Sequence, residues 1–174
     1  MVMGAGLDTG PLLAQRALPI APDETGASLH DKLAALGGAL LVETLPAYLS
    51  GALRPQPQPD DEALITYAGQ IKKEEGQIDW TQDAAAIDRL VRAFTPWPGT
   101  FTFWEGKLLK IKAGHPIRGR AAPGQVIAHA DGLAIGTGEG LYLPTSLQLE
   151  GKRATDAAAF VRGYGAIVGS TLGA

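Results

Sequence analysis

A stretch with three prolines at alternate positions divides this chain in two. It reads Arg-Pro-Gln-Pro-Gln-Pro-Asp-Asp-Glu over residues 54–62 and holds no other apolar residue. Because proline fixes φ and removes a backbone donor, such a stretch favours an extended, solvent-exposed tether. We therefore predict two modules, residues 1–52 and 64–174, joined by a semi-rigid linker over residues 53–63.

The first module begins with a glycine-flanked loop, Gly6 to Pro11, and then a segment that predicts a strand over residues 12–20. Leucines recur at three- and four-residue steps from Leu29 to Leu49, which is typical of a helix laid on a sheet or core. A glycine-flanked loop of this kind is typical of an active site, and an enzyme domain rarely starts on its own catalytic loop. We therefore expect Met1 to be an internal methionine or a truncated start, and residues 1–52 to be the end of a longer domain.

The second module predicts one helix followed by short strands. Ile87, Leu90, Val91 and Phe94 share a face of a helix over residues 83–95, which the Pro-Trp-Pro-Gly sequence at 96–99 ends. We expect hairpins at residues 100–113 and 124–136, a fifth strand region at 140–149 and a short helix at 155–164. Short strands with glycine turns favour a small closed or partly open β-barrel.

Charge and composition limit the classes of function. Residues 1–63 carry three basic and eight acidic groups, and the rest carries twelve basic and ten acidic groups, which suggests modules with different partners. The absence of cysteine excludes disulfides and thiolate chemistry, and three scattered histidines predict no metal site. We expect no signal peptide, no membrane-spanning helix and no membrane partner, so a cytoplasmic protein is the default.

Asp8 is the candidate catalytic residue of the first module. A carboxylate held between glycines can be oriented by backbone amides and can approach a ligand closely. It would then act as a general base, or hold and stabilise a charged imidazole. The alternative is a turn residue that hydrogen-bonds its own backbone, which is the commoner role of aspartate in such a loop.

Lysines of the second module are candidates for phosphate contacts. Lys72 and Lys73 precede Glu74 and Glu75, and this cancellation of charge favours a solvated connector over a nucleic-acid contact. Lys110 and Lys112 share one face of a predicted strand, where a basic surface for nucleic acid and a hydrated outer face are equally compatible with the pattern.

Trp97, one of three tryptophans in the chain, lies between two prolines. We interpret it as a core plug at the junction of helix and barrel rather than as a platform for stacking.

Taken in order, these motifs resemble one family, the methionyl-tRNA formyltransferases. The resemblance runs from residue 3 to about residue 165. It rests on Gly6-Leu-Asp-Thr-Gly-Pro11, the leucine pattern of residues 29–45, Tyr67-Ala68, Lys73-Glu-Glu75, Ile78-Asp-Trp80, Arg92-Ala-Phe94, Pro96-Trp-Pro-Gly99 and Gly151-Lys-Arg153.

The resemblance implies an α/β remnant of a Rossmann-like formyltransferase domain, a linker and an OB-like barrel with flanking helices. It implies transfer of a formyl group from 10-formyltetrahydrofolate to the α-amino group of methionyl initiator tRNA, with no metal. Asp8 falls on the family's catalytic aspartate, and Gly6, Leu7 and Asp8 fall in the loop that shapes the folate pocket. Lys72 and Lys73 fall in the segment associated with tRNA, and we expect Arg92, Lys110 and Lys112 to extend that positive track.

The family's catalytic asparagine and histidine have no counterpart here, so the resemblance implies a chain that is inactive alone. Its partners would be the initiator tRNA, the folate co-substrate and the missing N-terminal half of the enzyme. Two alternatives stay open: a fragment of a sugar-nucleotide formyltransferase, and a tRNA-binding barrel without catalytic function.

Overall fold

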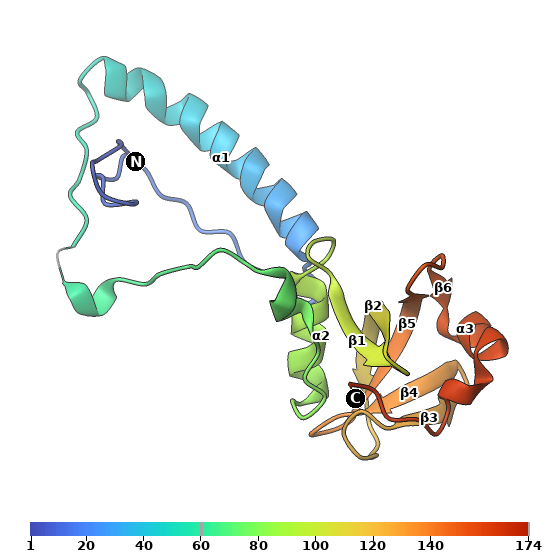
Figure 1. Cartoon of the computed structure of the whole chain (residues 1–174). Helices are drawn as coiled ribbons and strands as arrows, with labels where there is room; N and C mark the ends of the chain where they lie inside the picture. The colour runs from blue at the N-terminus through green and yellow to red at the C-terminus, as the bar shows by residue number, and fades with distance from the viewer. Residues whose placement is uncertain (60, 174) are drawn as a thin grey trace. The chain divides into compact units, whose positions relative to one another are not determined.

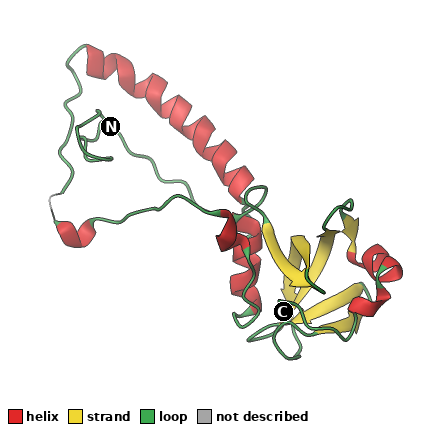
Figure 2. Ribbon diagram, viewed as in Figure 1, coloured by secondary structure: helices red, strands yellow, loops and turns green. Residues whose placement is uncertain are grey.

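The computed structural model describes residues 1–59 and 61–173, and the chain divides into two compact units. The first unit comprises Met1–Pro22 and Ser28–Gln70, and the second comprises Asp23–Ala27 and Ile71–Ala174. All named strands of the described residues lie in the second unit, and the first contains only helix and loop (Figure 2).

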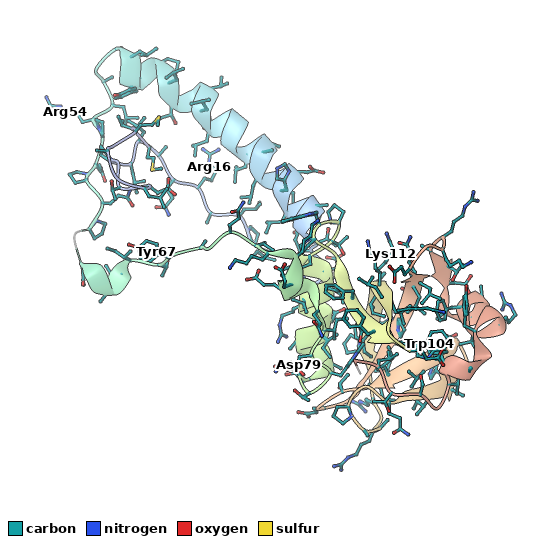
Figure 3. All side chains as sticks on the ribbon, in the orientation of Figure 1. Arg16, Arg54, Tyr67, Asp79, Trp104 and Lys112 are labelled. Atoms are coloured by element: carbon teal, nitrogen blue, oxygen red, sulfur yellow. The ribbon has the colours of Figure 1, made fainter. Side chains whose placement is uncertain are left out.

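The first unit is dominated by one long helix, α1, which spans Gly26–Leu49 (Figure 1). The predicted leucine stripe is present, but none of the helix residues is buried, and Leu33, Leu41, Val42 and Leu49 are exposed. Arg16, labelled in Figure 3, forms an ion pair of 2.9 Å with Glu43 of this helix. A short 3-10 turn, η1, follows at Glu62–Leu64. This unit therefore has an apolar helix without a core of its own.

The predicted strand over residues 12–20 is wrong. Only Leu12 forms a bridge, in which the amides and carbonyls of Leu12 and Gln56 exchange hydrogen bonds of 2.7 and 2.8 Å. Because prolines flank Gln56 on both sides, Gln56 supplies the one amide donor at that point of the segment. The proline-rich stretch is thus a pairing partner of the N-terminal segment and not only a tether.

The expectation of no membrane-spanning helix stays a prediction. By length and composition alone α1 is long and apolar enough to cross a membrane. This is weak evidence for a membrane, because helices that pack inside soluble proteins pass the same test.

The second unit is an antiparallel sheet with helices at its margins (Figure 1). The strands are β1 (Thr100–Trp104), β2 (Lys107–Ile117), β3 (Val126–His129), β4 (Gly132–Gly136), β5 (Leu141–Leu149) and β6 (Thr155–Asp156). Their order is β1-β2-β5-β4-β3, with β6 paired to β5. The helices are α2 (Ala84–Ala93) and α3 (Ala157–Gly163), and the 3-10 turns are η2 (Lys73–Gly76) and η3 (Gly165–Ile167).

The sheet is not closed, so of the closed or partly open barrel that the short strands favoured the closed form is absent, and the OB-like barrel implied by the resemblance stays a prediction. Instead, segments without strand structure cover both outer edges. At the β3 edge, Gly169 and Leu172 donate to the carbonyls of Val126 and Gly124 at 2.8 and 2.9 Å. At the β1 edge, Gly173 donates to the carbonyl of Phe103 at 2.9 Å. These contacts satisfy backbone groups that an exposed sheet edge would leave unpaired.

The core of this unit lies between the sheet and its two helices. α2 contributes Ala84, Ile87 and Val91 to it, and Trp104 packs edge-on against Phe160 of α3 and against Tyr164 (Figure 3). Asp83 caps α2 and Asp156 caps α3, each through a side-chain oxygen. Phe94, which the helical pattern placed inward, is only half-buried and lies outside this core.

We expect Ile87→Ala to destabilise the second unit by about 2–5 kcal/mol, because truncating a fully buried isoleucine removes apolar contacts and leaves a cavity. Phe94→Ala, at a half-buried position of the same helix, serves as the comparison and should cost clearly less. Denaturant unfolding of both variants checks this, and an equal loss from the two would contradict the observed packing.

Candidate functional site

The loop that carries Asp8 has a defined backbone shape. Asp8 has φ 52°, a left-handed conformation that aspartate tolerates better than most residues. Gly10 is buried, and a Cβ there would lie 1.7 Å from the carbonyl oxygen of Val2. The amide of Val2 also donates to the carbonyl of Pro11 at 2.9 Å. The glycine pattern therefore allows the N-terminal residues to close tightly over the loop.

Gln58 holds this loop from the proline-rich stretch. Its side-chain amide donates to the carbonyl oxygens of Asp8 and Gly10, at 2.8 and 2.6 Å. Sequence reasoning missed this role because it treated residues 54–62 as solvated linker. The sequence did contain a signal for this role, because glutamine is the only residue type between the alternating prolines and its side-chain amide can donate hydrogen bonds.

The side chains of the Asp8 loop face solvent. Asp8 and Leu7 are both exposed, and Leu7 is 83% exposed. Their predicted roles in catalysis and in binding a co-substrate stay predictions. Among the described residues, no group of three or more His, Asp or Glu side chains that could hold a metal ion is present.

Lys72 and Lys73 lie at the start of η2, with both side chains exposed. The amide of Lys72 donates to a side-chain oxygen of Glu75 at 3.0 Å, which closes the first turn. Gly76 ends the turn against the β-sheet, since a Cβ at this position would lie 2.3 Å from the carbonyl oxygen of Gly99. The two lysines are thus fixed next to the loop that leads into β1.

Arg92 has a structural role in the second unit. Its guanidinium donates to Asp88 one turn earlier at 2.8 Å, and to the backbone carbonyl of Glu24 at 2.8 Å. The amide of Ala27 donates in turn to the carbonyl of Thr95 at 3.0 Å. Arg92 therefore anchors Asp23–Ala27 on the end of α2, and its predicted contact with tRNA stays a prediction.

Lys110 and Lys112 lie on the outer face of β2, where alternate residues Leu109 and Ile111 face the core. Lys110 is paired across the strands with Phe101 of β1, a half-buried ring in edge-on contact with Phe103 at 5.8 Å. Neither lysine forms an ion pair with any residue that the structure describes. The outer face of β1 and β2 therefore combines aromatic rings with exposed positive charge.

The interpretation of Trp97 as a core plug is wrong. Its side chain is 57% exposed, whereas Trp80 and Trp104 are 5% and 6% exposed. Trp80 fills the core position instead, and its indole donates to the hydroxyl of Thr102 at 3.1 Å.

Asp79, in the Ile-Asp-Trp motif, shapes the turn before α2. It accepts hydrogen bonds from the hydroxyl and amide of Thr81 and from the side chain of Gln82, which lower its pKa below the ordinary 3.8 (Figure 3). The stability that this carboxylate contributes is present above its unfolded pKa and is lost as pH falls through the lowered folded value.

The second unit matches a known protein family. Residues 70–165, more than half of the chain, match the family model for the formyl transferase C-terminal domain. The chain therefore belongs to the formyltransferase family, and its second unit carries that family's C-terminal domain.

The chain is also similar in sequence to individual proteins of this family. The chain is 51% identical, over 98% of its length, to methionyl-tRNA formyltransferase of Myxococcus xanthus (strain DK1622), and covers 54% of that protein. It is 44% identical, over 99% of its length, to methionyl-tRNA formyltransferase of Citrifermentans bemidjiense, again covering 54% of it. The chain thus spans about half the length of the curated relatives it matches.

Solved structures share the fold. HypX from Aquifex aeolicus, as a four-residue variant, superposes with a TM-score of 0.68 at 20% identity over 95% of this chain and 30% of HypX. HypX in complex with tetrahydrofolic acid gives a TM-score of 0.66 at 22% identity, over 91% of this chain and 28% of HypX. At this identity the likeness establishes the fold alone.

We expect Arg92→Ala to lower the stability of the second unit by about 1.5–3 kcal/mol, the usual range for hydrogen bonds to charged groups. The matched control is Arg89→Ala, which removes an exposed arginine from the same helix and should have little effect. Thermal unfolding compares the two, and a stable Arg92→Ala variant would show that the anchor contributes nothing.

Proposed function

We propose that this chain is the C-terminal part of a methionyl-tRNA formyltransferase. In this role it helps transfer a formyl group from 10-formyltetrahydrofolate to the α-amino group of methionine on initiator tRNA. The observation that carries the proposal is the agreement over nearly the whole chain with proteins that bear this name, with both the Asp8 loop and the C-terminal domain included.

The chemistry assigns Asp8 a supporting part in the reaction. The methionine amine attacks the formyl carbon and a tetrahedral oxyanion forms. A proton then passes from the attacking nitrogen to the folate nitrogen, and the bond between the formyl carbon and the folate nitrogen breaks as the oxyanion collapses. An asparagine amide and a charged imidazole in the rest of the enzyme would stabilise that oxyanion. Asp8 would hold the imidazole in place and charged, and Gln58 would keep the Asp8 backbone in position. Gly6 and Leu7 would form part of the folate wall.

The exposed surface of α1 supports the view that the chain works with a further domain. A helix gains most of its stability in proteins by packing an apolar face, yet this one has no buried residue. Its exposed leucines and valine are the side chains that such packing would cover. We propose that the part of the relatives that has no counterpart here, which would complete a Rossmann-like domain, covers α1.

The second unit would bind the tRNA through its phosphates. Lys72, Lys73, Lys110 and Lys112 are exposed in the same compact unit, and η2 is fixed against Gly99 at the entry to β1. Phosphate contacts of this kind position a nucleic acid without reading its sequence. Arg92, which is committed to Asp88 and Glu24, would contribute at most through its charge.

We expect no formylation of methionyl-tRNA by the purified chain, because it lacks an asparagine and histidine for the oxyanion. Addition of the N-terminal part of the Myxococcus xanthus relative, fused or as a separate chain, should restore turnover. Asp8→Ala should then lower kcat by about 100-fold or more, because an imidazole that is no longer held in place and charged stabilises the oxyanion poorly. Asp23→Ala, at an exposed aspartate outside the loop, is the control.

Turnover by the chain alone would contradict the first expectation. Full activity of the restored enzyme with Asp8→Ala would remove Asp8 from the mechanism. Restored tRNA binding without turnover would instead favour the tRNA-binding module without catalytic function.

For tRNA binding, we expect Lys72→Ala with Lys73→Ala to weaken affinity and to flatten its salt dependence by about two units of the log–log slope. Both side chains are exposed, so the fold should be unchanged. A filter-binding salt titration measures the slope. The control is Lys107→Ala with Lys152→Ala, which removes the same charge elsewhere on the unit. If wild type and both double variants show the same salt dependence of tRNA affinity, Lys72 and Lys73 do not have the proposed role.

A further inference from the structure

Trp97 is the one tryptophan of this chain that is not packed into the core. A large exposed aromatic side chain gives up the favourable burial that Trp80 and Trp104 obtain, so its position calls for an explanation. It lies in the second unit, at the turn between α2 and β1.

The turn that presents Trp97 is rigid. The amide of Gly99 donates to the carbonyl of Phe94 at 2.9 Å, and the hydroxyl of Thr95 donates to the carbonyl of Val91 at 2.7 Å. Pro96 and Pro98 restrict φ on either side of the indole. A backbone restrained in this way loses little conformational freedom when a ligand binds to the residue that it presents, which favours preorganised recognition.

A hollow of about 120 Å³ lies beside this turn, within the second unit. One wall is formed by Pro96, Pro98 and Gly99, and the other by Lys110 and Lys112 of β2. The hollow is therefore lined both by apolar prolines and by two exposed lysines. An anionic group that enters it would meet both lysines while the neighbouring part of the same ligand lies over the indole.

We propose that this turn is a stacking site for an unpaired nucleotide: the Trp97 ring stacks on a base, and Lys110 and Lys112 contact the adjacent phosphate in the hollow. The inference rests on the proposed function, and it names the part of the tRNA that the site takes. Bases inside a duplex have their faces covered, so only a single-stranded segment offers a free face to Trp97. Aromatic stacking beside lysines is the chemistry by which proteins bind single strands without sequence preference.

The experiment uses the 174-residue chain with three probes: a short single-stranded RNA, a blunt RNA duplex of equal charge, and whole tRNA. We expect the single strand to quench the fluorescence of the exposed Trp97 and to shield it from acrylamide, and the duplex to do neither. Trp97→Ala should weaken binding of the single strand by about 5- to 150-fold with an unchanged salt slope. Trp97→Phe, which keeps a ring, should retain most of the affinity.

The double variant Lys110→Ala with Lys112→Ala should make RNA binding less dependent on salt. Comparing it with Trp97→Ala therefore separates the phosphate contact from stacking. One outcome would contradict the stacking site alone. In that outcome the salt dependence of tRNA binding depends on Lys110 and Lys112, but the Trp97→Ala variant binds the single strand as tightly as wild type does. The stacking site would then be wrong, and the proposed function would stand. If no probe binds at all, the proposed tRNA contact of this unit fails.

One result would reassign Trp97 to a different partner. If the N-terminal part of the Myxococcus xanthus relative shields Trp97 from acrylamide without RNA, and RNA adds no further protection, the indole is a contact between domains. That outcome would overturn the stacking site.

Discussion

Backbone contacts of the turn from Phe94 to Gly99 join several segments of the second unit. Its backbone accepts a hydrogen bond from Ala27, at the start of α1, and Gly99 is close enough to Gly76 that no side chain fits between them. From this turn the chain enters β1, whose inner face carries Thr102 and Trp104 into the core. The anchor of Asp23–Ala27, the lysines of η2 and the exposed Trp97 therefore all depend on one rigid backbone segment.

The two units obtain their stability in different ways. The second has a contiguous core in which Ile87 and Val91 of α2 and Phe160 of α3 pack on the sheet, and its edges are covered by chain segments that satisfy backbone groups. The first has a long helix without buried residues and a loop held by Gln56 and Gln58. This contrast agrees with a chain that spans about half the length of its relatives, because the apolar face of α1 has no partner among the described residues of its own unit.

The chemistry is divided in the same way. Asp8 and its loop belong to the first unit, and the exposed lysines and Trp97 belong to the second. In a complete formyltransferase the first would contribute to the reacting centre, whereas the second would hold a nucleic acid by its phosphates and, as we infer, by one unpaired base. Arg92 has a structural contact in the second unit, because its planar guanidinium donates to Asp88 and to the Glu24 carbonyl, and its predicted contact with tRNA stays a prediction.

The sequence by itself determined the local elements and the family. The helical spacing of Ile87 and Val91, the proline stop after Thr95 and the glycine turns between strands act over a few residues, so they can be read without a fold. Only the tertiary structure decided that residues 12–20 form no strand, that Gln58 supports the Asp8 loop, that the sheet stays open with its C-terminal segment along both edges, and that Trp97 is exposed while Trp80 is buried. Each of these depends on a contact between residues far apart in the chain, and local periodicity carries no information about which distant backbone group or side chain will be the partner.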